Sequence, residues 1–237
     1  MKIFEYETID STFVESGRMA PGLDEGQYLF LAECQTAGRG QGDHRFESPD
    51  GNGIYATLLL KYPKIHKSRL RLLTPMSAVC ITGQIKKHTG FGSRLTVRYV
   101  NDLMLDGKKY GGILSGTCVD GDMVNYIRIG FGINTGNCDV SGKVGIPTES
   151  IHIEDGNVRR KLALDCAESI TEATLWWDEE KIFIEYSEIC RMENVGIILP
   201  DGRICRCGKI DPDFSLNVIA SDGSVLKLNG TSGLRFI

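Results

Sequence analysis

The segment from Thr36 to Gly53 joins two apolar runs and combines repeated glycines with Arg39, Arg45 and a histidine. Its 18 residues make a connection longer than most in compact domains, and such loops are usually either functional or disordered. Glycines let backbone N–H groups approach a ligand closely, and the arginines add positive charge. The segment therefore favours a site for a carboxylate or a phosphate, with a surface loop of scattered charge as the alternative.

Two other patterns could do chemistry but are less specific. Gly130-x-Gly132 and Gly136 follow an apolar run, as in a dinucleotide-binding loop, but the third glycine is wrongly spaced and no helix follows. Cys205 and Cys207 could bind zinc, but neither a second pair nor a histidine lies near them. Cysteines within a strand are the simpler interpretation of that pair.

The elements that must position these residues are predicted from apolar periodicity and from turn residues. In the first half, Asp10, Ser11 and Thr12 offer capping oxygens for a short helix over Phe13–Met19. An amphipathic helix is predicted over Arg69–His88. The predicted strands of this half are Lys2–Ile9, Gln27–Glu33 and Ile54–Tyr62.

The second half begins with an antiparallel meander. The runs LTVRYV, KKYGGILSGTCV and MVNYIRIGFGI are separated by Asp106-Gly107 and Asp120-Gly121, which are strong hairpin signals. Val158–Cys190 is predicted to be helical throughout. Five short strands follow, separated by turn residues: Val195–Leu199, Arg203–Ile210, Phe214–Ala220, Val225–Leu228 and Gly233–Ile237.

These elements predict an α+β protein with a mixed, largely antiparallel sheet and packed helices over residues 1–192, then a small β-barrel domain over 193–237. The 237-residue chain has a net charge of −4 and no basic run, which argues against nucleic acid as its main partner. No apolar stretch has the length of a signal or a membrane span. The eight cysteines are expected to be reduced, which indicates a cytoplasmic protein.

Four ordered motifs together resemble the biotin protein ligase family. They are Asp10-Ser11-Thr12, the run QTAGRG from Gln35, the run VRYVNDLMLDGKKYGGILSGT from Val97, and GFGIN from Gly130. The family has a Ser-Thr pair after its first strand, Gln-x-Ala-Gly-Arg-Gly, Lys-Trp-Pro-Asn-Asp, Gly-Ile-Leu and Gly-Ile-Asn in the same order. The likeness extends over nearly the whole chain. It implies the class II synthetase-like fold of biotin and lipoate ligases, with an SH3-like barrel at the C-terminus.

The resemblance implies an ATP-dependent biotin–[biotin carboxyl-carrier protein] ligase. Such an enzyme activates biotin as biotinyl-5′-AMP and transfers it to a lysine of the biotin carboxyl carrier domain of a carboxylase. Mg²⁺ is expected to arrive on ATP, with no metal site formed by protein ligands alone.

The resemblance also implies site residues. Ser11, Thr12 and Gln35 would hydrogen-bond the head of biotin, and Arg39 and Arg98 would be the catalytic cations. The backbone of Gly112, Ile113 and Leu114 would line the biotin slot. The remaining residues expected at biotin or the nucleotide are Gly38, Gly40, Gln41, Phe46, Asn101, Asp102, Asn134 and Arg235.

Each of these residue types also has a purely local interpretation. Ser11 and Thr12 could only cap a helix, and Asn101-Asp102 could be a turn pair. Gly111 and Gly112 could mark a bulge or a close approach of strands. Arg235 could be an exposed strand residue.

Several residues depart from the family pattern. Arg98 stands at the family's lysine, and a planar guanidinium is not equivalent to a compact ammonium. Gln41 replaces an arginine of the basic loop and Asp43 adds an acid, so we expect slower adenylation or a leakier intermediate. The other departures are Phe46 for tryptophan, which could still stack on adenine, Phe13 for asparagine, and Gly116 for a frequent glutamate.

Two alternatives stay open. Arg98 and Gln41 fit a diverged paralogue that binds biotin without completing adenylation. A ligase or transferase for lipoate or octanoate would share the fold, although Gln35 and the Gly112-Ile113-Leu114 run favour biotin. Because the first predicted strand begins at Lys2, no DNA-binding role is expected, while both a monomer and a homodimer remain compatible with the sequence. The Thr36–Gly53 loop is expected to close on its ligand.

Overall fold

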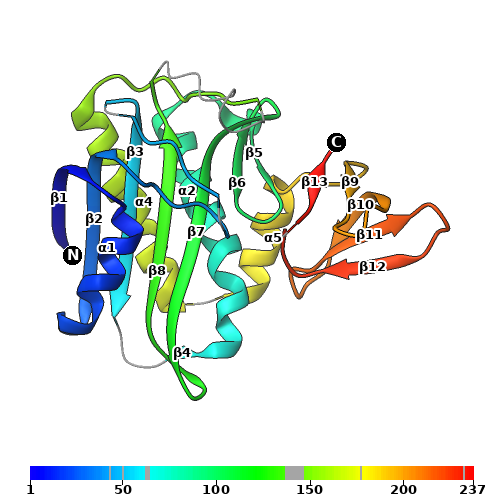
Figure 1. Ribbon diagram of the computed structural model, residues 1–237, viewed down its shortest axis with the longest axis horizontal. Coiled ribbons are helices and arrows are strands. Elements are labelled where there is room, and N and C mark those ends of the chain that lie inside the picture. The colour runs from blue at the N-terminus through cyan, green and yellow to red at the C-terminus, as the bar shows by residue number, and fades with distance from the viewer. Residues whose placement is uncertain (43, 50, 62–64, 137–146, 177, 232) are drawn as a thin grey trace.

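The computed structural model describes residues 1–42, 44–49, 51–61, 65–136, 147–176, 178–231 and 233–237. The larger of its two sheets has the strand order β1-β2-β3-β8-β7-β6-β5, with β4 paired to β8 beside this path (Figure 1). Strands β1 and β2 are parallel and the other neighbours are antiparallel, which confirms the predicted mixed sheet. The strands are β1 (Lys2–Ile9), β2 (Gly26–Gln35), β3 (Gly53–Lys61), β4 (Ile65–His66), β5 (Leu95–Arg98), β6 (Asp102–Leu105), β7 (Lys108–Asp120) and β8 (Met123–Asn134).

The Asp-Gly turns close hairpins as predicted. Asp106 and Gly107 have φ values of 50° and 77°, the left-handed conformation of a two-residue hairpin turn between β6 and β7. The predicted strand LTVRYV is shorter than expected, because the chain turns after Arg98 and returns as β6. This extra hairpin places the Tyr99–Asn101 connection at the sheet edge.

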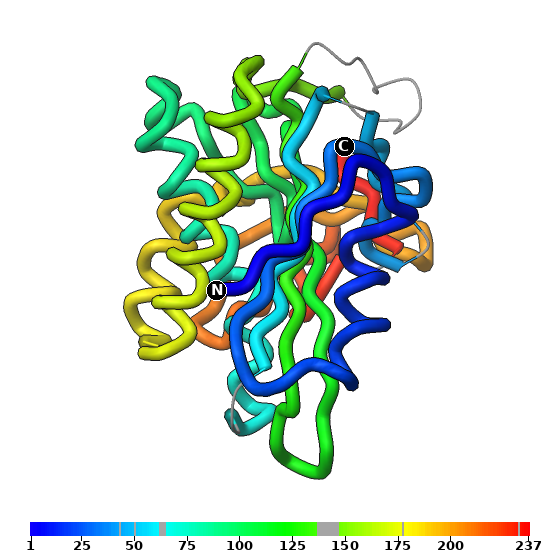
Figure 2. Tube along the Cα trace, turned by 90° about the vertical axis from the view of Figure 1, so that its left-hand side faces the viewer, coloured from blue at the N-terminus to red at the C-terminus, as the bar shows by residue number. Residues whose placement is uncertain are grey.

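Helices cover both faces of the larger sheet (Figure 2). α1 (Thr12–Met19) lies on one face, and α2 (Leu73–His88), α4 (Gly156–Trp176) and α5 (Glu179–Ile189) form a layer on the other. The prediction of one helix over Val158–Cys190 was wrong. α4 ends at Trp176, and the Asp178 side chain starts α5 by accepting a hydrogen bond from Lys181 N at 3.0 Å.

A short 3₁₀-helix leads into the helical layer. A 3₁₀-helix, η2 (Lys67–Leu72), precedes α2, so the α-helix predicted over Arg69–His88 begins later than expected. None of the helices in the described residues is both long and apolar enough to cross a membrane.

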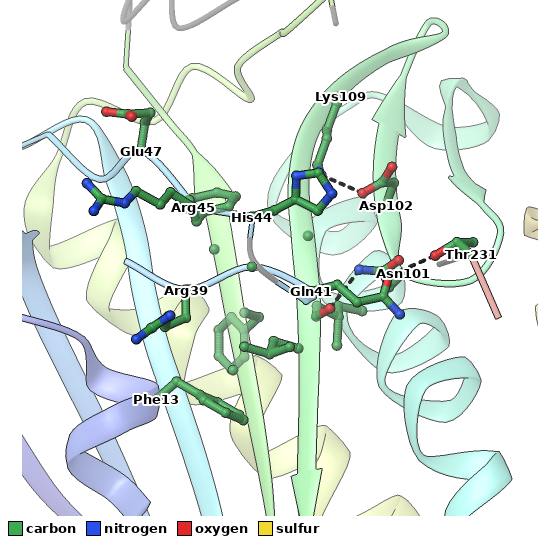
Figure 3. Close-up of a pocket in the computed structure, with 18 of the residues that line it drawn as sticks. Phe13, Arg39, Gln41, His44, Arg45, Glu47, Asn101, Asp102, Lys109 and Thr231 are labelled. Atoms are coloured by element: carbon green, nitrogen blue, oxygen red, sulfur yellow. Dashed lines mark hydrogen bonds and ion pairs between the residues drawn. The ribbon is translucent and has the colours of Figure 1, made fainter. Parts of the chain in front are cut away.

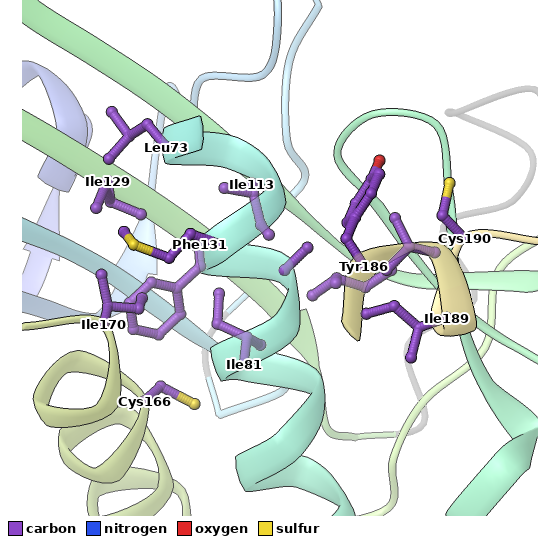
Figure 4. Close-up of a cluster of buried hydrophobic side chains, with 14 of the residues drawn as sticks. Leu73, Ile81, Ile113, Ile129, Phe131, Cys166, Ile170, Tyr186, Ile189 and Cys190 are labelled. Atoms are coloured by element: carbon purple, nitrogen blue, oxygen red, sulfur yellow. The ribbon is translucent and has the colours of Figure 1, made fainter. Parts of the chain in front are cut away.

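The main core lies between the larger sheet and the layer of α2, α4 and α5 (Figure 4). Ile81 of α2, Phe131 of β8 and Ile170 of α4 are fully or almost fully buried there. Leu162, Cys166 and Ile170 recur at helical spacing on α4, and all three side chains are buried. Removal of this apolar surface from water holds the helices against the sheet.

The C-terminal residues form a second sheet with the order β12-β11-β10-β9-β13. Its strands are β9 (Gly196–Ile198), β10 (Ile204–Ile210), β11 (Leu216–Ala220), β12 (Val225–Leu228) and β13 (Arg235–Phe236). The predicted strands are therefore present, but β12 and β13 form opposite edges, and the described residues do not close a barrel. Strand β13 has two residues and, within the part of the chain that the structure describes, pairs only with β9. Cys205 and Cys207 lie in β10 and are buried.

Candidate active-site cavity

A cavity of about 590 Å³ lies between the glycine-rich segment, the middle of the larger sheet and the C-terminal strand β13 (Figure 3). This size is typical of small-molecule sites. It brings together most of the predicted site residues, although these are spread from Ser11 to Arg235 in the sequence. The predicted residues that line it are Ser11, Thr12, Gln35, Arg39, Gly40, Gln41, Phe46, Arg98, Asn101, Asp102, Gly112, Ile113, Leu114 and Arg235. Gly38 and Asn134 are not among its lining residues.

The start of α1 supplies polar groups that are held in place by hydrogen bonds. Ser11 caps the helix, as its local pattern predicted, and lines the cavity as well. The backbone N and Oγ1 of Thr12 donate to Gln35 Oε1 at 2.9 and 3.1 Å, and Thr12 Oγ1 lies 3.0 Å from Thr57 Oγ1. Gln35 Nε2 donates to Ser48 Oγ at 2.8 Å. The head of a bound ligand would therefore meet donors and acceptors that are already oriented.

The glycine-rich segment folds into a small hairpin over the cavity. Gly40 N donates to His44 O at 2.8 Å, and Phe46 N donates to Gly38 O at 3.0 Å. This pairing brings Arg39 opposite Arg45. Both guanidinium groups are exposed and form no ion pair with a described residue, so their charge is available to an anion. Asp43, which the sequence analysis identified as an added acid in this segment, lies outside the described residues.

Two glycines leave the space that Phe46 occupies, one for its ring and one for its backbone. A methyl group on Gly132 would lie 2.5 Å from Cε1 of Phe46, so the ring packs directly on the strand backbone of β8. A methyl group on Gly38 would collide with the carbonyl oxygen of Phe46. Gly38 therefore shapes the hairpin from outside the cavity.

A cluster of three charged side chains forms the opposite wall. Arg98 donates to Asp102 Oδ2 from Nε at 3.1 Å and from Nη2 at 2.5 Å. On the other side, Lys109 Nζ lies 2.5 Å from Asp102 Oδ1 (Figure 3). These three side chains are 15–21% exposed, so the ion pairs are only partly screened by water.

The two cations outweigh burial in setting the charge of Asp102. Burial by itself raises the pKa of this carboxyl, but Lys109 and Arg98 lower it more, and the pKa lies below its ordinary value of 3.8. Asp102 is therefore a fixed anion at neutral pH. It holds two cations beside the cavity and leaves a net positive charge on the cluster.

Lys109 reaches this cluster because of a β-bulge. Lys109 pairs with Met104 and Gly111 pairs with Leu103, so Tyr110 is an extra residue in β7. The bulge puts Lys109 on the same face as Asp102 and Gly112, where regular alternation would have put it on the opposite one. A methyl group on Gly112 would lie 3.6 Å from the Lys109 ammonium, so this charge stands directly over the predicted biotin slot.

The two predicted asparagines make backbone contacts. Asn101 Nδ2 donates to Ile113 O at 2.9 Å, and Ile113 N donates to Asn101 O at 3.0 Å, so Asn101 fixes the floor of the cavity. Asn134 Nδ2 donates to Glu149 O at 3.2 Å and anchors a neighbouring segment outside the cavity. Gly111 is a point of close strand approach, because a methyl group there would lie 2.5 Å from Gly132 O.

The C-terminal sheet completes the cavity. Arg235 lines it, and the ring of Phe236 lies 5.0 Å from the Arg98 guanidinium. Thr231 Oγ1 donates to Gln41 Oε1 at 2.7 Å and so joins the C-terminal loop to the glycine-rich hairpin (Figure 3). Tyr99 Oη lies 3.1 and 3.0 Å from the carbonyl oxygens of Phe214 and Leu228. The Arg98–Asp102 wall is thus attached to the second sheet.

Several lining residues belong to none of the motifs in the sequence. Lys109 lies in the sequence between two predicted site motifs, Asn101-Asp102 and Gly112, and this position could have indicated a role in the site. The sequence does not reveal the bulge that turns its side chain toward the cavity. Thr231 and Phe236 carry no motif of their own. The lining residues that were not assigned are Phe13, His44, Glu47, Ala56, Thr57, Tyr99, Lys109, Gly130, Phe131, Gly132, Thr231, Leu234 and Phe236.

A known family accounts for the first half of the chain. The description "Biotin/lipoate A/B protein ligase family" belongs to the family model that matches residues 6–134, more than half of the sequence. The chain is 35% identical over 129 residues to the bifunctional ligase/repressor BirA of Bacillus subtilis. It is 30% identical over 151 residues to the biotin–[acetyl-CoA-carboxylase] ligase of Paracoccus denitrificans. These matches include 54% and 62% of the chain, but they span only 39% and 62% of the two relatives.

Solved structures share the fold over the full length. The biotin protein ligase from Aquifex aeolicus in complex with biotin and ATP matches 100% of this chain and 99% of its own, with a TM-score of 0.75 and 17% identity. The biotin protein ligase from Leishmania major in complex with biotinyl-5-AMP matches 96% and 98%, with a TM-score of 0.64 and 17% identity. These likenesses confirm the predicted fold of the larger sheet and its helices.

Proposed function

Because the chain belongs to the biotin/lipoate A/B protein ligase family, we propose that it is an ATP-dependent biotin protein ligase. In the first step, a carboxylate oxygen of biotin attacks the α-phosphorus of ATP. The bond from that phosphorus to the oxygen bridging to the β-phosphorus breaks, and pyrophosphate leaves. In the second step, a lysine amine attacks the acyl carbon of biotinyl-5′-AMP, AMP leaves with the bonding electrons, and the amine loses a proton. The proposed acceptor is the biotin carboxyl carrier domain of a carboxylase.

The observation that carries the proposal is that one cavity combines a polar end, a backbone-lined floor and a group of cations. Biotin and ATP are both anions, so bringing the carboxylate to the α-phosphate requires positive charge between them. Fixed cations that need not reorganise stabilise such a transition state, and positioning of the two reactants supplies much of the remaining acceleration. The cations that line the cavity are Arg39, Arg45, Arg98, Lys109 and Arg235.

We assign the carboxylate and the α-phosphate to Lys109 and Arg98, on the two sides of Asp102. The departure at Arg98 removed the ammonium that the family has there, but Lys109 supplies a compact ammonium beside the same aspartate. The Lys109 ammonium lies over Gly112, which is proposed to line the biotin slot, so it would lie close to the bound acid. Arg39 and Arg45 are assigned to the outer phosphates, because they are exposed at the mouth of the cavity.

Mg²⁺ would enter with ATP and neutralise part of the phosphate charge. Mg²⁺ usually binds through phosphates, water and one or two carboxylates. Both oxygens of Asp102 already contact Arg98 and Lys109, so the metal would be held mainly by the phosphates and by water. Among the described residues no group of three or more His, Cys, Asp or Glu side chains is arranged to hold a metal ion.

The names of the relatives support the proposal of a biotin protein ligase. The Paracoccus relative is a biotin–[acetyl-CoA-carboxylase] ligase by name, and the Aquifex structure contains biotin and ATP. We also propose that residues 193–237 are a separate small domain of the SH3-like barrel type, supported by five short strands in one sheet. A cytoplasmic location is proposed on the free cysteines of the described residues.

A second candidate is a biotin-binding relative that does not complete adenylation. The observation that favours it is the state of Arg98, whose guanidinium is already engaged by Asp102 and lies against Phe236. If Lys109 could not replace the family's lysine, the cavity would bind the acid and stop there.

The deciding experiment is biotin-dependent release of pyrophosphate from ATP, run beside calorimetric titration of biotin alone. Release that requires biotin would establish adenylation, and transfer to a carrier domain would then be tested. Heat of biotin binding without pyrophosphate would favour the second candidate. In that case, recovery of release in an Arg98→Lys variant would identify this position as the cause. If biotin gives neither signal, lipoate and octanoate are the next acids to test.

A further inference from the structure

Phe13 bounds the polar end of the cavity with an apolar ring. It is the second residue of α1 and lines the cavity beside Thr12. A methyl group on Gly130 would lie 3.0 Å from Cδ2 of Phe13 and 3.4 Å from Oγ1 of Thr57. The ring and the hydroxyl group therefore meet at one point of the floor, so a ligand head placed there contacts a polar and an apolar surface together.

Arg128 of β8 fixes the position of this ring. Its guanidinium lies 4.4 Å from the ring centroid, and Nη1 donates to Phe13 O at 2.8 Å. Its Nε is buried and has no hydrogen-bond partner among the described residues. An unsatisfied buried donor is destabilising, so stability alone does not explain an arginine at this place.

Glycines provide the space for the Phe13–Arg128 pair. A methyl group on Gly116 would lie 2.7 Å from Cζ of Phe13 and 3.2 Å from Nη2 of Arg128. A methyl group on Gly17 would collide with the Arg128 guanidinium. Gly116 and Arg128 are directly opposite in the β7–β8 ladder, so the missing side chain of one makes room for the other. Phe13 and Gly116 are also two of the positions at which the sequence departs from the family pattern.

We propose that Phe13 is a specificity-determining residue that limits the width of the acid's head, and that Arg128 is the residue that positions it. The inference rests on the proposed function, because the acid is taken to be the substrate of adenylation. The preferred ligand is a carboxylic acid whose ring system has one polar edge and one apolar edge. The polar edge lies toward Thr12 and Gln35, and the apolar edge lies against Phe13. A thioether suits that edge, because sulfur makes favourable contacts with aromatic rings.

The test measures the affinities of octanoate, lipoate, biotin and biotin sulfone by calorimetry. Octanoate has no ring, and the two added oxygens of the sulfone widen and polarise the thioether edge. The proteins are the wild type, Phe13→Ala, Phe13→Trp and Arg128→Met. The Trp variant keeps an aromatic ring if the Ala variant fails to fold. Thermal unfolding of each variant separates loss of selectivity from loss of structure.

We expect the wild type to prefer biotin over its sulfone, and Phe13→Ala to reduce that preference by about tenfold, a typical effect of pocket shape on closely related ligands. Phe13→Trp should weaken biotin more than octanoate. Arg128→Met should also reduce the preference for biotin over its sulfone, because the ring of Phe13 is no longer held in place. A purely structural role would weaken all four acids by the same factor in every variant, and that result would overturn the inference.

Failure of the proposed function would look different. If the wild type prefers lipoate or octanoate to biotin, the acid assignment is wrong, and the preference between those two acids becomes the readout. A change of that preference in Phe13→Ala or Phe13→Trp would still support Phe13 as the limiting residue, and an unchanged preference would overturn it. Binding of none of the four acids to the wild type would overturn both proposals.

Discussion

Asp102 lies between two cations that differ in the freedom they keep. Arg98 donates to it twice and has Phe236 over its guanidinium, so much of its donor edge and one face are engaged. Lys109 meets the other carboxylate oxygen, and an ammonium has three donors. At least one donor of Lys109 therefore remains for a ligand above Gly112. This difference makes Lys109 the stronger candidate for direct contact with the reacting groups.

The first prediction concerns Lys109→Met, which keeps the chain length and removes the charge. Biotin-dependent pyrophosphate release should fall by about 10²–10³-fold, the usual cost of losing one fixed electrostatic contact to a transition state. Lys108→Met is the matched control, because Lys108 is 52% exposed and pairs with Glu149 away from the cavity. Its rate should stay within about twofold of the wild type. Equal losses in both variants, or none in Lys109→Met, would contradict the assignment.

The second prediction concerns Asp102→Asn, which leaves Arg98 and Lys109 without their common anion. The free energy of unfolding at pH 7 should fall by about 2–4 kcal/mol, because one partner of a mostly buried ion pair is lost. Since the folded-state pKa of Asp102 is lowered, its stabilisation is complete above the unfolded-state pKa and is lost as pH falls through the folded-state value. The difference between wild type and variant should therefore be constant between about pH 5 and 7 and shrink below pH 3.8.

Urea unfolding of both proteins across this pH range measures that difference directly. Other carboxyl groups titrate in both proteins and cancel in the comparison. Asp106→Asn is the control, because Asp106 pairs with Arg94 at the exposed end of the same hairpin. If the difference in the free energy of unfolding grew as the pH fell, the stabilisation of the fold by Asp102 would not depend on the ionised carboxylate.

At the scale of the elements, the position of the glycine-rich hairpin depends on the absence of a side chain at Gly132 of β8. Phe46 packs on the backbone of β8 at Gly132 and lies edge-on to Tyr55, with ring centroids 6.4 Å apart. The ring thus joins the hairpin to the sheet. Any side chain at Gly132 must displace the ring that helps to hold Arg39 and Arg45 over the cavity.

Gly132→Ala is the third prediction. Because the new methyl group would lie 2.5 Å from the Phe46 ring, we expect the free energy of unfolding to fall by about 1–3 kcal/mol, as for other overpacked sites. Biotin affinity, measured by calorimetry, should fall as well, because the hairpin moves with the ring. The control is Gly90→Ala, where a methyl group meets no atom within 4 Å. Unchanged biotin affinity in Gly132→Ala would separate the hairpin from the ligand site.

The elements also mark what the sequence could and could not reveal. Strands and Asp-Gly hairpins were predictable, because apolar alternation and left-handed turn residues act locally. The break at Asp178 was missed because the apolar pattern continues across it, and only the capping hydrogen bond reveals a second helix. The ordered motifs identified most of the cavity. They did not reveal Lys109, since a bulge at Tyr110 depends on pairing with β6, nor Phe236, since its contact with Arg98 depends on how the two sheets pack.

At the scale of the whole molecule, the second sheet is part of the site. Tyr99, in the wall that carries Arg98, contacts the carbonyl oxygen of Phe214, just before β11, and that of Leu228 in β12, and the residue is only 2% exposed. Thr231 makes a second connection, to Gln41 of the hairpin. The end of the cavity at Thr12 and Gln35, where the head of the acid is proposed to bind, has no hydrogen bond to the second sheet in the described residues. The two ends of the cavity should therefore respond differently to changes in the second sheet.

Arg235→Gln should affect one end of the cavity and not the other. Arg235 lines the cavity from β13 and is followed by Phe236, whose ring lies 5.0 Å from the Arg98 guanidinium, so the charge of Arg235 should act on the nucleotide. We expect Arg235→Gln to raise the KM for ATP by about tenfold, the loss of one charge-assisted contact, while calorimetry shows unchanged affinity for biotin alone. Arg206→Gln is the matched control, because Arg206 is exposed in β10 of the same sheet and does not line the cavity. If Arg235→Gln weakened biotin and ATP equally, the second sheet would support the whole cavity, and the assignment of Arg235 to the nucleotide would be wrong.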